Sequence, residues 1–199
     1  MDKLISVEKN KVFTSEILIN KSRFLCFAKH IENKEEAEEF LNEIRKKYAD
    51  ARHICYAYRL KNTSKASDDG EPGGTAGRPM LLVLEKQNLY DIIAVVVRYF
   101  GGIKLGAGGL LRAYSNAVTE CIDNAQKVEW ELAKLYRIKM DYKAYKPFLN
   151  SIKNRKVQVL SADFSEGACL EVVASMQENL ADAEFLGEMM HSFEKGDNF

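Results

Sequence analysis

Apolar and polar residues follow two different periods along the first part of the chain, and these periods predict its first elements. From Glu16 to Ala28, apolar side chains recur on both sides of Asn20-Lys21, which predicts two strands around a turn. From Lys34 to Tyr48, apolar residues fall three and four positions apart, which predicts an amphipathic helix. From His53 to Leu60 the pattern alternates, which predicts a strand with one set of apolar side chains on the same side. The residues on that side are Ile54, Tyr56, Tyr58 and Leu60.

Glycine and proline interrupt the pattern before a second set of apolar runs. Residues 67–79 are too rich in both for a regular element, and Pro79 suits the first turn of a short helix that runs through Leu84. The nearly continuous apolar run from Asp91 to Phe100 predicts a buried strand. A glycine-rich loop and a long helix follow. The apolar stripe of that helix comprises Leu110, Leu111, Tyr114, Ala117, Val118, Cys121, Ile122 and Ala125.

The pattern restarts after residues 126–129, which are predicted to form a linker. The elements predicted beyond it are a strand over 132–142, a helix over 144–153 with Pro147 in its first turn, strands over 157–164 and 168–176 around a turn at 165–167, and a helix over 180–193 with Asn179 as its N-cap. This β-α-β-β-α order is the body of a ferredoxin-like domain. We therefore expect an α+β protein with two domains, residues 1–127 and 128–199.

Composition adds an expected cellular location and reveals an uneven distribution of charge along the chain. The 46% of hydrophobic and 29% of charged residues are typical of a soluble globular protein, and the longest apolar run, Ile92 to Val97, is too short to cross a bilayer. The cysteines lack the spacing of metal or redox sites, so we expect buried, reduced thiols in a cytoplasmic protein. They are Cys26, Cys55, Cys121 and Cys169. Net charge is zero, yet Lys134 to Lys156 holds eight basic residues against Asp141 alone.

Nine of the twelve glycines fall between Gly70 and Gly109, in two clusters. In the second cluster a strand, a glycine loop and a helix succeed one another, an arrangement that aims backbone N–H groups at an anion. Arg98, Lys104 and Arg112 would neutralise a bound phosphate there. The alternative is that these glycines only permit tight packing of strand against helix. The segment is neither a P-loop nor a dinucleotide-binding fingerprint.

The first cluster carries carboxylates, in the run Asp68-Asp69-Gly70-Glu71. Such oxygens could bind a hard cation, but they are also ordinary turn formers and could pair with Arg78 or Arg52. We expect no metal and treat the run as a partner-binding loop. His53 is expected to belong to a basic patch, the alternative being a hydrogen-bonded structural residue.

Several stretches in and before the glycine clusters, taken in their order along the chain, resemble those of a known family. They are Ser22-Arg-Phe24, Ala51 to Tyr58, Ser67 to Pro72, Gly74 to Gly77 and Arg98 to Tyr114. With them the chain closely resembles the IMPACT/YigZ family. The resemblance implies a first domain like the second domain of ribosomal protein S5, and a second domain similar to the last domain of translation elongation factor G. Eukaryotic members of the family regulate translation through a kinase-activating partner.

From these observations we expect an RNA- or ribosome-associated protein that influences translation by binding, with no catalytic residue and no cofactor. The residues expected to contact phosphate or nucleic acid are Arg23, Arg52, His53, Arg78, Arg98, Tyr99, Gly101, Gly102, Lys104, Gly106, Gly108, Gly109 and Arg112. The second domain would add Lys143, Lys146, Lys153 and Arg155. One alternative is an enzyme acting on a nucleotide or phosphorylated small molecule, with a metal on Asp68, Asp69 or Glu71. Another is a protein-interaction module that docks through residues 68–79.

Overall fold

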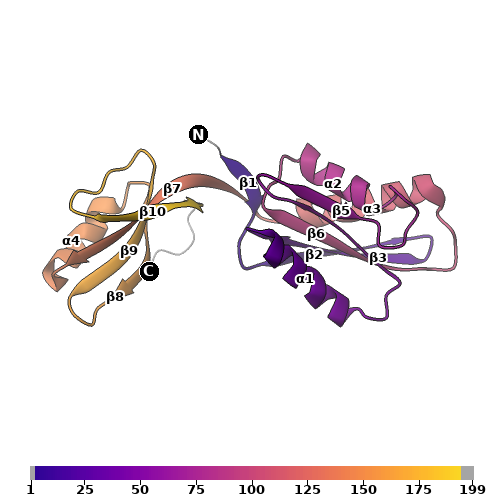
Figure 1. The fold of residues 1–199 in the computed structure, drawn as a ribbon, viewed down its shortest axis with the longest axis horizontal. Coiled ribbons are helices and arrows are strands. Elements are labelled where there is room, and N and C mark those ends of the chain that lie inside the picture. Colours follow the sequence, from indigo (N-terminus) through magenta and orange to yellow (C-terminus); the bar gives the residue numbers. More distant parts are fainter. Residues whose placement is uncertain (1–2, 194–199) are drawn as a thin grey trace. The chain divides into compact units, whose positions relative to one another are not determined.

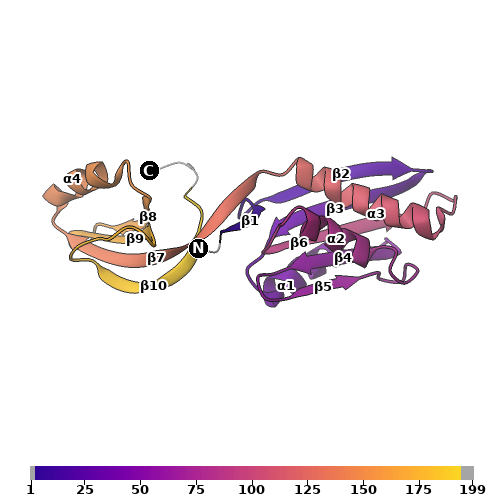
Figure 2. The same ribbon diagram turned by 90° about the horizontal axis from the view of Figure 1, so that it is seen from above.

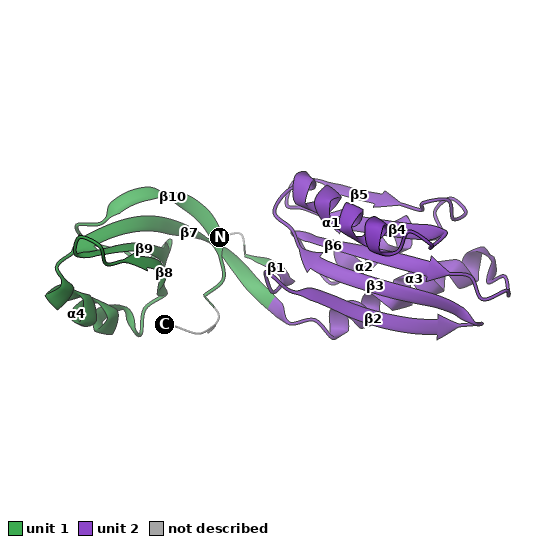
Figure 3. Cartoon of the chain, turned by 90° about the horizontal axis from the view of Figure 1, so that it is seen from below, with its two compact units in different colours: residues 1–4, 128–199 green, residues 5–127 purple. Residues whose placement is uncertain are grey.

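The computed structural model describes residues 3–193, which form two sheets and four helices in a mixed α and β fold (Figure 1). The chain divides into two compact units (Figure 3). One unit comprises Ile5–Lys127, and the other comprises Leu4 and the chain from Val128 onward. No helix in the described range has the length and apolar character needed to cross a membrane.

The unit Ile5–Lys127 is built on a sheet of five antiparallel strands. In sheet order they are β2 (Val12–Ile19), β3 (Ser22–His30), β6 (Ile92–Tyr99), β4 (His53–Arg59) and β5 (Ser64–Ser67). The predicted turn joins β2 to β3, and both of its residues, Asn20 and Lys21, have positive φ, as tight hairpins require. The central strand β6 is buried at every position except Tyr99, because helices cover both faces of the sheet.

Three helices sandwich this sheet (Figure 2). Helix α1 (Lys34–Lys47) packs on one face, over the side of β4 that carries Ile54, Tyr56 and Tyr58. Helices α2 (Gly77–Lys86) and α3 (Gly106–Asp123) pack on the other. The elements predicted for this unit are confirmed, with one change in the α3 stripe: Leu111 is 46% exposed and does not join the core.

The second unit is another antiparallel sheet, and helix α4 (Tyr142–Ile152) packs on one of its faces. Its strands are β7 (Lys127–Met140), β8 (Val157–Asp163), β9 (Ala168–Ser175) and β10 (Glu184–His191). The sheet order is β1-β7-β9-β8, with β1 (Leu4–Val7) at one end and β10 also paired to β7.

Two predictions in this half are wrong. The helix expected over 180–193 is strand β10, which pairs with β7 from Glu184↔Arg137 to His191↔Glu131, so Asn179 caps no helix. Pairing with a distant strand overrides the weak helical pattern, and a bulge before Gly187 breaks any regular period. The linker expected over 126–129 is absent, because β7 begins at Lys127 and buries Val128 as part of the strand.

Candidate functional site

The two glycine clusters meet at one end of the first sheet, on the right in Figure 1. There β3 and β4 begin and β6 ends: Arg23 pairs with Tyr99, and His53 pairs with Arg98. The loop before α3 continues from β6, and the loop before α2 continues from β5. We call this region, made of residues 16–23, 50–53, 67–77 and 98–112, the glycine-rich end.

Two of its glycines are required by close packing. A Cβ on Gly101 would lie 1.9 Å from the carbonyl carbon of Lys21, and one on Gly77 would lie 2.6 Å from the backbone nitrogen of Ser67. By contrast, Gly102, Gly106 and Gly108 face open space, with no atom within 4 Å of the Cβ position. Packing therefore explains only some of the glycines, and the stretch around the start of α3 is left uncovered by the described chain.

Asp68 organises the loop that leads into α2. Its carboxylate accepts hydrogen bonds from the backbone N–H groups of Gly74 (2.8 Å), Ala76 (2.9 Å) and Gly77 (2.8 Å). Partial burial acts to raise the pKa of Asp68, but the three N–H donors together lower it below its ordinary value. Since the Ala76 side chain cannot cap α2, Asp68 performs this function from eight residues earlier in the chain.

Asp69 ties the same loop to β4. Its carboxylate accepts a hydrogen bond from Ile54 N (2.7 Å), and its carbonyl oxygen lies 2.9 Å from His53 Nδ1. His53 is therefore hydrogen-bonded to the loop backbone, which is the structural role left open above. Gly70, next in the chain, is exposed beside the His53 ring, which would lie 3.5 Å from a Cβ on that glycine.

Glu71 and Arg98 form a buried ion pair, so neither side chain belongs to the exposed surface. Arg98 Nη1 donates to Glu71 Oε1 at 2.6 Å, with side chains 7% and 3% exposed. Tyr114 Oη donates to the same oxygen at 2.8 Å, and Cys55 Sγ lies 3.3 Å from Tyr114 Oη. Burial raises the pKa of Cys55 to about 12. This network links β4, β6 and α3 to the loop, so the expected roles of Arg98 on phosphate and of Glu71 in docking do not fit their positions.

The three carboxylates of the first cluster therefore point to three different sets of partners. Within residues 3–193, no three His, Cys, Asp or Glu side chains come together as a possible metal site. The alternative of a metal held jointly by Asp68, Asp69 and Glu71 is not supported by this arrangement.

The exposed part of the glycine-rich end surrounds the start of α3. Leu105, the N-cap residue, makes no side-chain hydrogen bond to the helix, and the first turn holds no acid. The free N–H groups of Gly106, Ala107 and Gly108 are thus available to an anion. Lys104 and Arg112 flank them, both exposed. Sequence reasoning missed the exposed Ile103 (47%), whose apolar character gave no sign of exposure.

Charges at this end are unevenly paired. Each acid of its four segments has a partner: Glu16 binds Arg23 (2.6 Å), Asp50 accepts from Tyr99 Oη (2.9 Å), and Asp68, Asp69 and Glu71 are bonded as above. Several cations make no ion pair within the described chain. They are Lys21, Arg52, Lys104 and Arg112, all exposed. The surface therefore presents uncompensated positive charge.

The remaining residues predicted to bind nucleic acid differ in whether they form ion pairs. Arg23 and Arg78 are exposed but paired, the latter with Glu85 at 3.2 Å. In the second unit, Arg155 binds Glu178 (2.8 Å), whereas Lys143, Lys146 and Lys153 are exposed.

This chain is a member of the IMPACT family: residues 20–122 match the sequence profile of the Impact N-terminal domain, which confirms the predicted family. The IMPACT family member YvyE of Bacillus subtilis is 41% identical over 177 residues, covering 87% of this chain and 82% of that protein. YigZ of Escherichia coli is 44% identical over 109 residues, covering 52% of this chain and 53% of that protein. A solved crystal structure of a hypothetical protein is 31% identical, with a TM-score of 0.64 over 87% of this chain and 86% of that one.

Proposed function

We propose that this protein binds RNA or the ribosome through the exposed glycine-rich end and influences translation by binding, without catalysing a reaction. The observation that carries the proposal is the uncapped start of α3 between two exposed, unpaired cations, Lys104 and Arg112. Free N–H groups and the helix dipole favour a phosphate at that position, and the cations add charge-assisted contacts. The translational role rests on the family resemblance of the sequence, and the expected location is the cytoplasm.

The fold analogies belong to the same proposal. We infer that residues 1–127 are similar to the second domain of ribosomal protein S5, and residues 128–199 to the last domain of translation elongation factor G. The order β10-β7-β9-β8, antiparallel throughout, supports a ferredoxin-like sheet in which β10 follows without the second helix. A fold shared with translation proteins supports a role in translation only by analogy.

The alternatives receive less support from the site. An enzyme using a metal on the first cluster would need carboxylates that converge, and these bond to separate partners. A docking loop built on the same carboxylates would need them exposed, and Glu71 is buried. The second unit could extend an RNA surface through Lys143, Lys146 and Lys153.

The test is equilibrium binding of a structured RNA by filter retention at several salt concentrations. Each phosphate contact adds about 0.7 to 0.9 to the slope of log affinity against log salt, so Lys104→Ala with Arg112→Ala should lower the slope by about 1 to 2. The matched control is Lys34→Ala with Lys86→Ala, which removes two exposed cations outside the glycine-rich end. Absence of binding at low salt, or an equal loss in both double variants, would overturn the proposal.

A further inference from the structure

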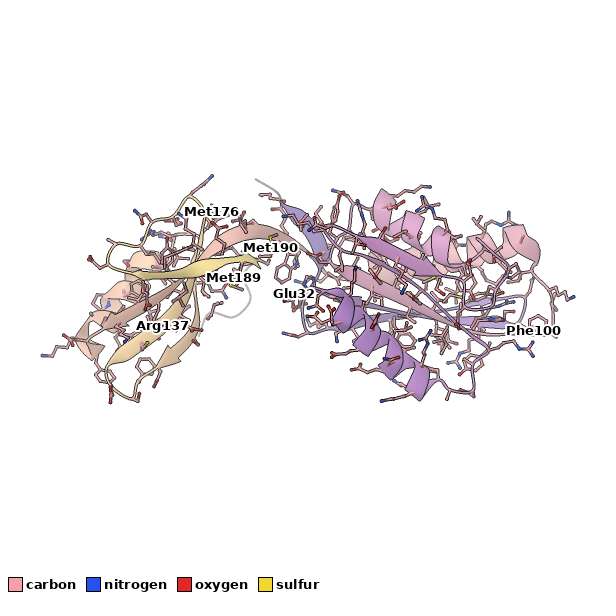
Figure 4. All side chains as sticks on the ribbon, in the orientation of Figure 1. Glu32, Phe100, Arg137, Met176, Met189 and Met190 are labelled. Carbon is pink, nitrogen blue, oxygen red and sulfur yellow. The ribbon has the colours of Figure 1, made fainter. Side chains whose placement is uncertain are left out.

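An exposed aromatic side chain lies at the glycine-rich end, directly after a paired strand. Phe100 follows the last paired residue of β6 and is 50% exposed. Figure 4 labels it at the end of this unit, where β6 runs into the loop before α3. An exposed aromatic ring beside uncompensated cations has a recognised use, which is to stack on the base of a bound nucleotide.

Residues before and after Phe100 are anchored in the fold. The Arg98 guanidinium carbon lies 5.7 Å from the centroid of the Phe100 ring, and Arg98 itself is fixed by the buried Glu71 carboxylate. On the other side, Gly101 packs closely on the backbone of Lys21, where an added Cβ would lie 1.9 Å from the Lys21 carbonyl carbon. Because the backbone on both sides of Phe100 is anchored, less conformational freedom is lost when a base stacks on the ring.

The surroundings of Phe100 favour an anionic partner with flat apolar groups. Ile103 (47%) and Leu111 (46%) add exposed apolar surface in the same strand-loop-helix segment. Lys104 and Arg112 lie in that segment too, and every acid of the glycine-rich end is already bonded. Alternating cations and exposed apolar groups are typical of surfaces that bind single-stranded nucleic acid.

We propose that the glycine-rich end binds unpaired RNA, with the phosphate at the start of α3 and a base stacked on Phe100. This inference rests on the proposed function and adds the substrate class, because a duplex keeps its bases stacked inside and offers Phe100 nothing to stack on. Base recognition by stacking is tolerant of sequence, so we expect little preference among bases.

The experiment compares one RNA oligonucleotide, single-stranded and annealed to its complement, at fixed salt. Wild type should bind the single strand more tightly. Phe100→Ala should weaken single-strand binding about tenfold or more and leave duplex binding nearly unchanged. Phe100→Trp should retain single-strand binding, and its added fluorescence should be quenched by the RNA. The control is Leu82→Ala, which removes an exposed apolar side chain (38%) from α2. Thermal unfolding verifies that each variant is folded.

The outcomes separate this inference from the function it rests on. If neither RNA form binds at low salt, both the proposed function and this inference are overturned. If both forms bind equally, with sensitivity to Lys104→Ala and Arg112→Ala but none to Phe100→Ala, the proposed function survives and unpaired RNA is excluded as the preferred class. Binding of polyglutamate in place of RNA, dependent on Phe100, would overturn the inference in favour of an acidic protein partner.

Discussion

The buried pair of Glu71 and Arg98 predicts a large and specific loss of stability when one partner is removed. The Glu71 side chain is 3% exposed in this structure. In Arg98→Met its carboxylate loses the 2.6 Å ion pair and keeps the 2.8 Å hydrogen bond from Tyr114. Breaking a buried pair leaves an uncompensated charge, which costs about 3 to 5 kcal/mol of unfolding free energy. Glu71→Gln should cost a similar amount, because it leaves the guanidinium charge buried.

The double variant is the informative one. Combining Arg98→Met with Glu71→Gln removes both charges, so its loss should be smaller than the sum of the single losses by about 2 kcal/mol or more. Because the chain divides into two compact units, stability should be measured locally, by native-state hydrogen exchange of the β6 amides in the first sheet. Single losses below about 1 kcal/mol, or strictly additive losses, would refute the assignment of this pair as a buried structural bond.

Three further predictions concern stability. Gly101→Ala should lower the free energy of unfolding, measured in urea, by several kcal/mol, because the new Cβ would lie 1.9 Å from the backbone of Lys21. Gly108→Ala should be neutral or slightly stabilising, because Gly108 lies in a helix and faces open space. Equal effects of the two substitutions would contradict the packing argument. Burial, with Lys9 nearby, lowers the pKa of His30 from 6.5 to about 4. The contribution of neutral His30 to folding stability is therefore complete above pH 6.5, and on the order of 3 kcal/mol is lost as the pH falls toward 4. A stability profile that His30→Gln does not flatten in that window would count against this. Asp68→Ala should destabilise the start of α2 by about 2 kcal/mol, seen as faster hydrogen exchange at Ala76 and Gly77, and unchanged exchange there would be the contrary result.

Local patterns predicted most of the first unit. The period of α1, the alternation of β4 and the two-residue turn at Asn20-Lys21 are each specified by neighbouring residues. Strand β10 was missed because its partner, β7, lies more than forty residues earlier, and its own sequence has neither a clear helical nor a clear strand period. The short polar strand β5 was missed for the same reason: only pairing with β4 defines it.

The candidate site, too, was only partly predictable from the sequence. The glycine clusters lie in separate loops of the sequence, and the strand pairing brings them to one end of the sheet. The burial of Arg98 was not foreseen, although Arg98 continues the buried run of β6. No pattern within either cluster reveals that Glu71 meets Arg98, because that contact depends on how the loop before α2 folds back over β6.

The central claim is that RNA phosphate binds at the start of α3, and its most direct test is a titration of the isotope-labelled protein with an unpaired RNA oligonucleotide, followed by amide NMR. We predict that the amide signals of Gly106, Gly108 and Gly109 shift progressively with RNA, and that those of Lys34 and Lys86 do not. If the amides at the start of α3 stay unchanged while RNA binds elsewhere, or if no signal moves at low salt, the claim is contradicted.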